Sequence, residues 1–288
     1  MIYLDNHYSL LHRIDPEATS LPDLQEIIRA CHGSRIRRID RYIQLCLAGG
    51  LSCVGERELP GNTGVYLASR CGAVDTSARV MHAMEVAGEQ PKPLHFVNTL
   101  GNSAGFYLTQ LLGLTGNTVV VSAEELSFEA ALAHACIDLA LGQVGAALVG
   151  GFDEVTLPLA SQRERLGAAH SSAAMLEGSH WLLLQRHRCK AGSQKTLLPP
   201  RYFTDLEQWC ESERAVEQSP GLQLAFAPSA QEQQALAGLA YQVYLPENGA
   251  LAHGVWSGAA LTALLDQGVG VHLAKAGESY CALSVTHA

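Results

Sequence analysis

The spacing of apolar residues is most regular between residues 103 and 151. A run of β-branched residues at Thr118–Ser122 and a second apolar run at Ala146–Val149 predict buried strands. Between them, the Ala/Leu-rich segment Phe128–Leu141 predicts a helix that ends at Gly142. A strand, a helix and a second apolar strand in this order are typical of an α/β layered fold whose sheet is covered on both faces.

Outside this central part, the pattern predicts further elements on both sides. Helical spacing predicts helices over Leu21–Ala30, Ile36–Leu51, Ala78–Ala87, Ser103–Leu114 and Ala250–Leu265. Short apolar runs predict strands over Gly64–Ala68, Ala173–Gln185 and Ser279–Val285. Residues 186–220 are richer in charge, Pro and Ser, and are expected to form a joint or a surface excursion. No internal repeat is visible in the sequence.

Composition narrows the function classes. The chain has 288 residues, of which 48% are hydrophobic and 16% charged, as in a well-packed globular protein. Its net charge of −9 argues against a nucleic-acid or anionic-membrane partner. The first 30 residues hold no continuous apolar segment, so no signal peptide or membrane insertion is expected there. The eight cysteines are scattered and form no CxxC pair, so we interpret them as small buried hydrophobic residues rather than as disulfides or zinc ligands. A cytoplasmic location is expected, without metal or cofactor.

The segment Asn102–Val155 carries a resemblance to a known family. It contains an Asn-x-x-Ala-Gly helix, a Gly-Leu-x-Gly turn, a Val-Ser strand end and a strand that ends in Gly150-Gly151. In this order and spacing it resembles the β-ketoacyl synthase core. Three further segments resemble the same family in the same order: the Arg-x-x-Asp-Arg helix start at Arg37–Arg41, GVYLASRCGA at 64–73, and AMLEGSHWLLLQ at 174–185.

The resemblance implies a thiolase-like fold with α/β/α/β/α layers and a truncated C-terminal half. Residues 1–188 would form a core like the N-terminal half of a ketosynthase. Residues 189–288 would form a shortened, degenerate C-terminal half packed on it.

Glu125 stands where the family carries its nucleophilic cysteine, at a tight strand-to-helix turn. Amides and the positive helix end stabilise a thiolate at such a turn. A carboxylate fits the same field, with a gain of up to about 1 kcal/mol. It cannot form the acyl thioester on which chain transfer depends.

The family also uses two histidines for malonyl decarboxylation. Leu222–Leu236 resembles the first histidine segment, but Ala227-Pro228-Ser229 replaces the His-Gly-Thr part. The segment 248–261 resembles the second and keeps His253, with Asn248 where the family has lysine. The resemblance therefore implies that no residue is catalytic, and that His253 and Asn248 are vestigial.

These residues also have simpler interpretations. Glu124-Glu125 could be the acidic first turn of a surface helix. His253 could be a hydrogen-bonded core or surface histidine, and Phe106 and Tyr107 could pack in the core.

A ketosynthase-like chain without a nucleophile resembles a chain-length factor, which pairs with an active, full-length β-ketoacyl-ACP synthase. Thr118, Val119, Val120, Val121 and Ser122 would then lie at the heterodimer interface. The loop Ser69–Val74, with Cys71 and Gly72, would be the gate of the partner's acyl tunnel, and Phe106 and Tyr107 are secondary candidates.

The short second half resembles subunits of aryl polyene biosynthesis, which act on chains held by an acyl carrier protein. Two other functions stay open at this point. One is a malonyl-ACP decarboxylase or priming enzyme, and the other is a stand-alone acyl- or ACP-binding scaffold.

Overall fold

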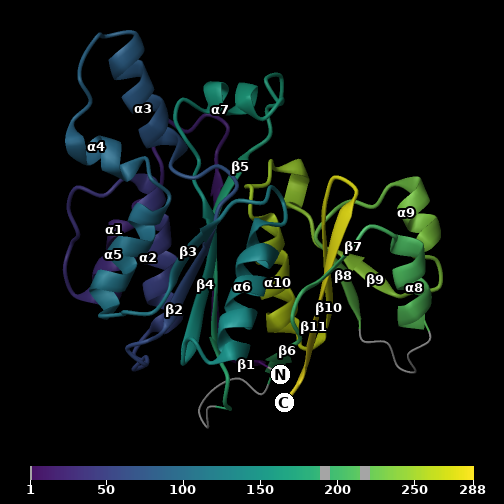
Figure 1. The fold of residues 1–288 in the computed structure, drawn as a ribbon. Helices are drawn as coiled ribbons and strands as arrows, with labels where there is room; N and C mark the ends of the chain where they lie inside the picture. The colour runs from purple at the N-terminus through teal and green to yellow at the C-terminus, as the bar shows by residue number, and fades with distance from the viewer. Residues whose placement is uncertain (1, 189–194, 215–220) are drawn as a thin grey trace.

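The computed structural model describes residues 2–188, 195–214 and 221–288 (Figure 1). The elements up to residue 185 are β1 (Ile2–Ile14), α1 (Gln25–His32), α2 (Arg41–Val54), β2 (Gly64–Ala68), α3 (Val74–Glu85), α4 (Pro93–Asn98), α5 (Asn102–Leu112), β3 (Thr118–Val121), α6 (Ser127–Leu141), β4 (Ala146–Asp153), α7 (Leu159–Arg165) and β5 (Met175–Gln185). The later elements are β6 (Lys195–Leu197), β7 (Arg201–Phe203), α8 (Leu206–Arg214), β8 (Leu222–Leu224), α9 (Ala230–Ala235), β9 (Tyr241–Val243), the 3₁₀ turn η1 (Glu247–Gly249), α10 (Trp256–Gln267), β10 (Gly270–Ala276) and β11 (Ser279–His287).

The strands form one mixed sheet in which a strand order occurs twice. The first half runs β1-β5-β4-β2-β3 and the second runs β6-β11-β10-β8-β9, with β7 added beside β11. Directions repeat as well, because β2 with β4 and β8 with β10 are parallel, whereas β4 with β5 and β10 with β11 are antiparallel. The two corresponding strands β1 and β6 pair with each other and join the halves. The fold therefore contains an internal repeat that the sequence does not show, and the domain boundary predicted after residue 188 stays a prediction.

Helices separate and cover the two halves of the sheet (Figure 1). Helices α1, α2 and α5 pack on the outer face of the first half. Helices α6 and α10 lie between the halves, where Phe128 and Leu261 share a core with Leu182 of β5 and Leu283 of β11. Helices α8 and α9 cover the outer face of the second half. The predicted α/β/α/β/α layering is confirmed.

Most predicted elements are present, with shifted ends. The strand predicted at Gly64–Ala68 has those bounds, and the predicted Phe128–Leu141 helix starts one residue earlier. Helix α2 begins only at Arg41, because Arg38 has a φ of 62° and interrupts the helix predicted from Ile36. Helix α10 begins only at Trp256, because the backbone of Leu251 bonds instead to Ala174 and Leu176.

The long first strand was not predicted, because its many polar residues obscure the alternation of apolar and polar positions that is typical of a strand. β1 pairs with β5 from Tyr3 to Ile14, with one irregularity between Leu4 and Asn6. Ser9 and His12 bond buried side chains of β5, namely His180 and Glu177. Polar residues on this strand therefore cover buried polar side chains of the next strand, which an apolar pattern cannot reveal.

The predicted joint at 186–220 is only partly loop. It contains β6, β7 and α8, and residues 189–194 and 215–220 of it lie outside the described residues. Within the part of the chain that the structure covers, no helix has both the length and the apolar character needed to cross a bilayer.

Candidate functional site

Glu125 lies in the turn between β3 and α6, just before the helix begins at Ser127. Ser127 Oγ accepts a hydrogen bond from Ala123 N (2.8 Å) and donates one to Glu124 O (2.6 Å). Glu124 has a φ of 51°, which few residues other than glycine adopt. The turn is therefore closed tightly, with the side chain of Glu125 left outside it.

The side chain of Glu125 is paired with Arg70, whose Nη1 lies 2.7 Å from Glu125 Oε1. About 40% of each side chain is exposed. An exposed ion pair contributes up to about 1 kcal/mol, because water and salt screen it. The carboxylate therefore pairs with a cation from the loop after β2, and it is not held in a buried pocket.

Asp153, at the end of β4, holds the loop Ser69–Val74. Its carboxylate accepts hydrogen bonds from Ser69 Oγ (2.5 Å), Arg70 N (3.2 Å) and Cys71 N (3.3 Å). Gly72, with a φ of 66°, donates its N–H to Ser69 Oγ. Burial raises the pKa of Asp153 to about 6, although these hydrogen bonds oppose the shift. The predicted gate loop thus has a fixed shape.

Glu154 follows directly and is also buried. Its Oε1 accepts from Asp75 N at the start of α3 (2.8 Å), whereas Oε2 has no partner among the described residues. Burial, together with nearby carboxylates, raises the pKa of Glu154 to about 8, so the carboxyl is largely protonated at neutral pH. Sequence reasoning missed both acids, although two carboxylates directly after a buried strand end were a visible signal.

His253 is buried in the loop before α10 and stacks on His180 of β5. The two Nε2 atoms lie 3.1 Å apart, and His180 Nδ1 lies 2.8 Å from Ser9 Oγ. One imidazole must donate to the other, so the accepting ring is uncharged. Burial lowers the pKa of His253 to about 4 and that of His180 well below its usual value. His253 Nδ1 has no partner within the described chain.

A cavity of about 150 Å³ brings some of these residues together. Its wall includes Cys71, Asp153, Glu154 and His253, with Arg70 beside them. The structure thus unites the predicted gate residue Cys71 with the histidine interpreted as vestigial. Glu125 is not part of the wall.

The other predicted site residues lie elsewhere. Asn248 is exposed in η1, with a φ of 52°. Phe106 and Tyr107 lie on α5 and contact each other edge to face, with ring centroids 5.8 Å apart. Tyr107 packs against the core, whereas 60% of Phe106 is exposed. Neither aromatic residue lines the cavity that Cys71 borders.

The predicted interface strand β3 is an edge strand. It pairs with β2 on one side, and no described strand pairs with its other side. Val119 and Val121 contact the core beside α6, and Val120 contacts the core beneath α5. Ser122, the last residue of the prediction, lies just beyond the strand and donates from its Oγ to Ser69 O. An unpaired edge of this kind can pair with another chain.

A large apolar surface lies on α3, α4 and the start of α5. Its members are between 37% and 71% exposed: Met81, Met84, Val86, Leu94, Phe96, Val97, Leu100 and Phe106. We call these eight residues the α3–α5 surface. Figure 1 shows α3 and α4 standing out from the layered body. A concentration of exposed apolar residues on neighbouring helices is typical of protein–protein contacts.

A buried ion pair joins two of the segments that resembled the family. Arg41, at the start of α2, donates from Nε to Glu177 Oε2 of β5 (3.2 Å) and pairs with Oε1 through Nη2. His12 Nδ1 lies 3.1 Å from the same carboxylate. Burial opposes ionisation of Glu177, but His12 and Arg41 outweigh it and lower its pKa.

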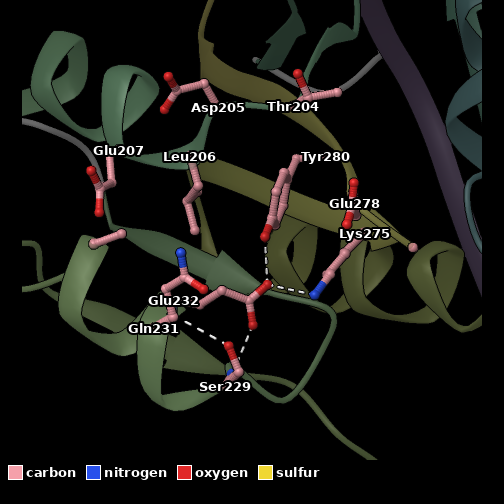
Figure 2. A pocket seen from close by; sticks show the side chains of 12 residues that line it. Thr204, Asp205, Leu206, Glu207, Ser229, Gln231, Glu232, Lys275, Glu278 and Tyr280 are labelled. Atoms are coloured by element: carbon pink, nitrogen blue, oxygen red, sulfur yellow. Dashed lines mark hydrogen bonds and ion pairs between the residues drawn. The ribbon is translucent and has the colours of Figure 1, made fainter.

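A second groove, of about 540 Å³, lies in the C-terminal half (Figure 2). At its centre, Glu232 accepts from Lys275 Nζ (2.6 Å), Tyr280 Oη (2.5 Å) and Ser229 N (2.7 Å). These partners lower the pKa of Glu232 to about 2 despite its burial. The carboxylate is fully satisfied, which is the pattern of a structural support.

Comparison with known proteins gives the family. Residues 23–175 match the model of the β-ketoacyl synthase N-terminal domain. The chain belongs to the β-ketoacyl synthase family. No curated protein sequence matches the chain.

Several solved structures share the fold. The ishigamide ketosynthase/chain length factor is 14% identical with a TM-score of 0.73, and the match covers 99% of this chain and 98% of that one. A type II PKS acyl-carrier protein in complex with its ketosynthase gives 13% identity, a TM-score of 0.70 and coverage of 100% and 99%. A ketosynthase in complex with its chain length factor from Xenorhabdus doucetiae gives 12%, 0.52 and 98% of each chain. The chain therefore has the thiolase-like ketosynthase fold.

Proposed function

We propose that this chain is a non-catalytic, chain-length-factor-like subunit that pairs with an active, full-length β-ketoacyl-ACP synthase and shapes its acyl tunnel. The observation that carries the proposal is the α3–α5 surface together with the unpaired edge of β3. Two of the structures that share the fold contain a ketosynthase with a chain length factor. A half-exposed apolar surface beside an open strand edge suits a subunit that is buried in a heterodimer.

The chemistry of the turn at β3 and α6 supports a non-catalytic role. Glu125 offers no thiol, and its carboxylate is neutralised by Arg70. His253 and His180 hold each other as neutral, buried rings. Of the groups that the resemblance requires for condensation, the thiol is thus absent and His253 is engaged with His180.

The gate would be the loop of Cys71 and Gly72; in support of this, Asp153 fixes the shape of the loop and Cys71 borders the cavity. Phe106 belongs to the α3–α5 surface, so it would contact the partner directly, with Tyr107 supporting it from the core. The complex would act on chains carried by an acyl carrier protein in the cytoplasm, in polyene and specifically aryl polyene biosynthesis.

Co-expression with a full-length ketosynthase that is encoded by an adjacent gene tests the pairing of the two chains. The two chains should elute as one heterodimer on size exclusion, because the apolar surface and the strand edge are both covered. The double substitution Phe96→Asp and Val97→Asp should reduce co-purification at least tenfold. A matched control is Leu245→Asp, at a similarly exposed apolar residue in the second half of the chain. Separate elution of the wild-type chains, or equal loss with the control, would refute the proposal.

A further inference from the structure

Helices α3 and α4 carry most of the α3–α5 surface, but they have few apolar anchors of their own. None of residues 74–98, all of which the structure describes, belongs to the hydrophobic clusters that form the core. Within the two helices, Thr76, Val80 and Asn98 are buried. Helices with so few buried apolar contacts open locally at little cost unless polar contacts hold them.

A groove of about 660 Å³ runs beside α3. One wall is formed by residues of α3, among them Arg79 and His82, and the other by residues of the segment 156–165. The element that α3 contacts most is α4. The two helices therefore support each other, and their orientation on the body of the molecule depends on a few polar contacts.

Asp40 supplies two of these contacts. It is the N-cap residue of α2, where an acidic side chain usually accepts a hydrogen bond from the first turn of its own helix. Here no such bond forms. Instead, Asp40 Oδ1 accepts from Arg79 Nη2 of α3 (3.1 Å), and Oδ2 accepts from Asn98 Nδ2 at the end of α4 (2.9 Å). One carboxylate therefore ties both helices to α2.

Both sides of this contact are fixed. Helix α2 is buried along most of its length, beginning with Tyr42 directly after its first residue. On the other side, Arg79 Nε pairs with Asp75 Oδ2 (3.0 Å), and Arg79 Nη2 also donates to Thr76 Oγ1 (3.3 Å). The guanidinium is thus held by its own helix in the orientation in which it meets the carboxylate.

We propose that Asp40 is a positioning residue for partner binding, whose carboxylate holds α3 and α4 in the orientation in which the α3–α5 surface meets the ketosynthase. This inference rests on the proposed function, because that function makes this surface a contact with the partner. A surface that is held in place before binding avoids the loss of conformational freedom that a loose one would suffer on docking. Loss of the carboxylate should therefore weaken binding, although every apolar side chain of the surface is kept.

Hydrogen exchange of the full chain without a partner, followed by mass spectrometry, tests the positioning. Asp40→Ala should speed exchange about tenfold over residues 74–98 and leave residues 118–153 unchanged. A matched control is Asp23→Ala, because Asp23 also precedes a helix and accepts from Gln25 N of α1. Unchanged exchange over residues 74–98, equal acceleration throughout the chain, or the same acceleration over 74–98 with the control would overturn the inference.

Affinity for the ketosynthase at low and high salt gives a second readout. High salt screens the partly exposed pair of Asp40 and Arg79 but does not weaken an apolar contact, so wild-type affinity should fall as salt rises. Asp40→Ala should bind about tenfold more weakly than the wild type at low salt, and its affinity should fall less as salt rises. Equal affinity of the two proteins at low salt, or equal salt dependence, would overturn the inference.

If Asp40→Ala does not fold, Arg79→Ala decides the outcome, since it removes the same ion pair from the more exposed side and leaves α2 intact. Its exchange over residues 74–98 and its salt dependence should change in the same directions. Failure of the wild type to bind the ketosynthase would overturn the proposed function. Exchange that these variants leave unchanged would overturn this inference alone.

Discussion

The two repeats of the sheet have the same strand order but differ in the segments that connect two of their parallel strands. In the first repeat, residues 69–117 connect β2 to β3 and carry α3, α4 and α5, with their exposed apolar side chains. In the second repeat, residues 225–240 connect β8 to β9 and carry only α9, which is capped by Ser229 and Glu232. The first connection exposes apolar side chains that a partner would cover. The helix of the second connection is capped by residues of the same chain.

A buried acid in each repeat shows the same contrast. Glu177 is fully enclosed between Arg41 and His12, whereas Glu232 borders an open groove (Figure 2). The enclosed acid has no access to water if a partner is removed, and the other does. The first repeat should therefore be the more sensitive to loss of a single charge.

The largest effect is expected for Arg41→Met. This change leaves the carboxylate of Glu177 buried, with His12 as its remaining side-chain partner, and should lower the free energy of unfolding by about 3–5 kcal/mol. Urea unfolding followed by tryptophan fluorescence measures it. A loss below about 1 kcal/mol would contradict the enclosed ion pair.

The next effect concerns pH and Glu154. Its folded pKa of about 8 lies above the value in an unfolded chain, so its contribution to stability is present at low pH and is lost as pH rises through about 8. The histidine pair acts oppositely, and its contribution is lost as pH falls through the unfolded value near 6.5 toward 4. Above pH 6.5 the ionisation of Glu154 therefore outweighs that of the histidine pair in the pH dependence of stability.

Glu154→Gln should remove this dependence, because the amide keeps the acceptor for Asp75 N and cannot ionise. Between pH 6.5 and 8, the wild type should lose about 2 kcal/mol more stability than the variant. Melting curves across this range are the measurement. Parallel curves for the two proteins would show that Glu154 does not titrate there.

A smaller effect is expected in the second repeat for Lys275→Met. Glu232 keeps Tyr280 and Ser229 as partners and lies beside water, so the loss should be about 1 kcal/mol. The same urea titration measures it beside Arg41→Met. If the two losses were equal, the contrast between the repeats would be wrong.

The smallest effect is expected for Glu125→Gln. The pair with Arg70 is exposed, so unfolding should change by less than about 1 kcal/mol, and less still in high salt. Melting temperatures at low and high salt provide the comparison. A large, salt-independent loss would indicate that Glu125 supports the turn in a way that the ion pair does not explain.

Sequence patterns predicted the regular parts of the first repeat well. The apolar run Gly64–Ala68 depends only on burial, so its strand appears with the predicted bounds, whereas the other predicted strands have shifted ends. β1 was missed because its polar residues bond partners distant in sequence, as His12 bonds Glu177. The short strands β8 and β9 were missed because three residues carry no periodicity.

The candidate site was predictable only in part. The family resemblance pointed to Cys71 and His253, and the fold brings both to one cavity. Asp153 and Glu154 were not singled out, because their burial and raised pKa values depend on the loop and helix that fold over them. The pairing of Glu125 with Arg70 likewise depends on two loops that meet only in the folded chain.

The central claim is that this chain is a non-catalytic partner of a ketosynthase. An elongation assay with a full-length ketosynthase that is encoded by an adjacent gene tests it most directly. Acyl carrier protein, malonyl units and the ketosynthase are combined with and without this chain, and the products are measured by mass spectrometry. The proposed role predicts full-length products only when both chains are present, and none from this chain alone. Condensation or decarboxylation by this chain alone, or the same products from the ketosynthase alone, would contradict it.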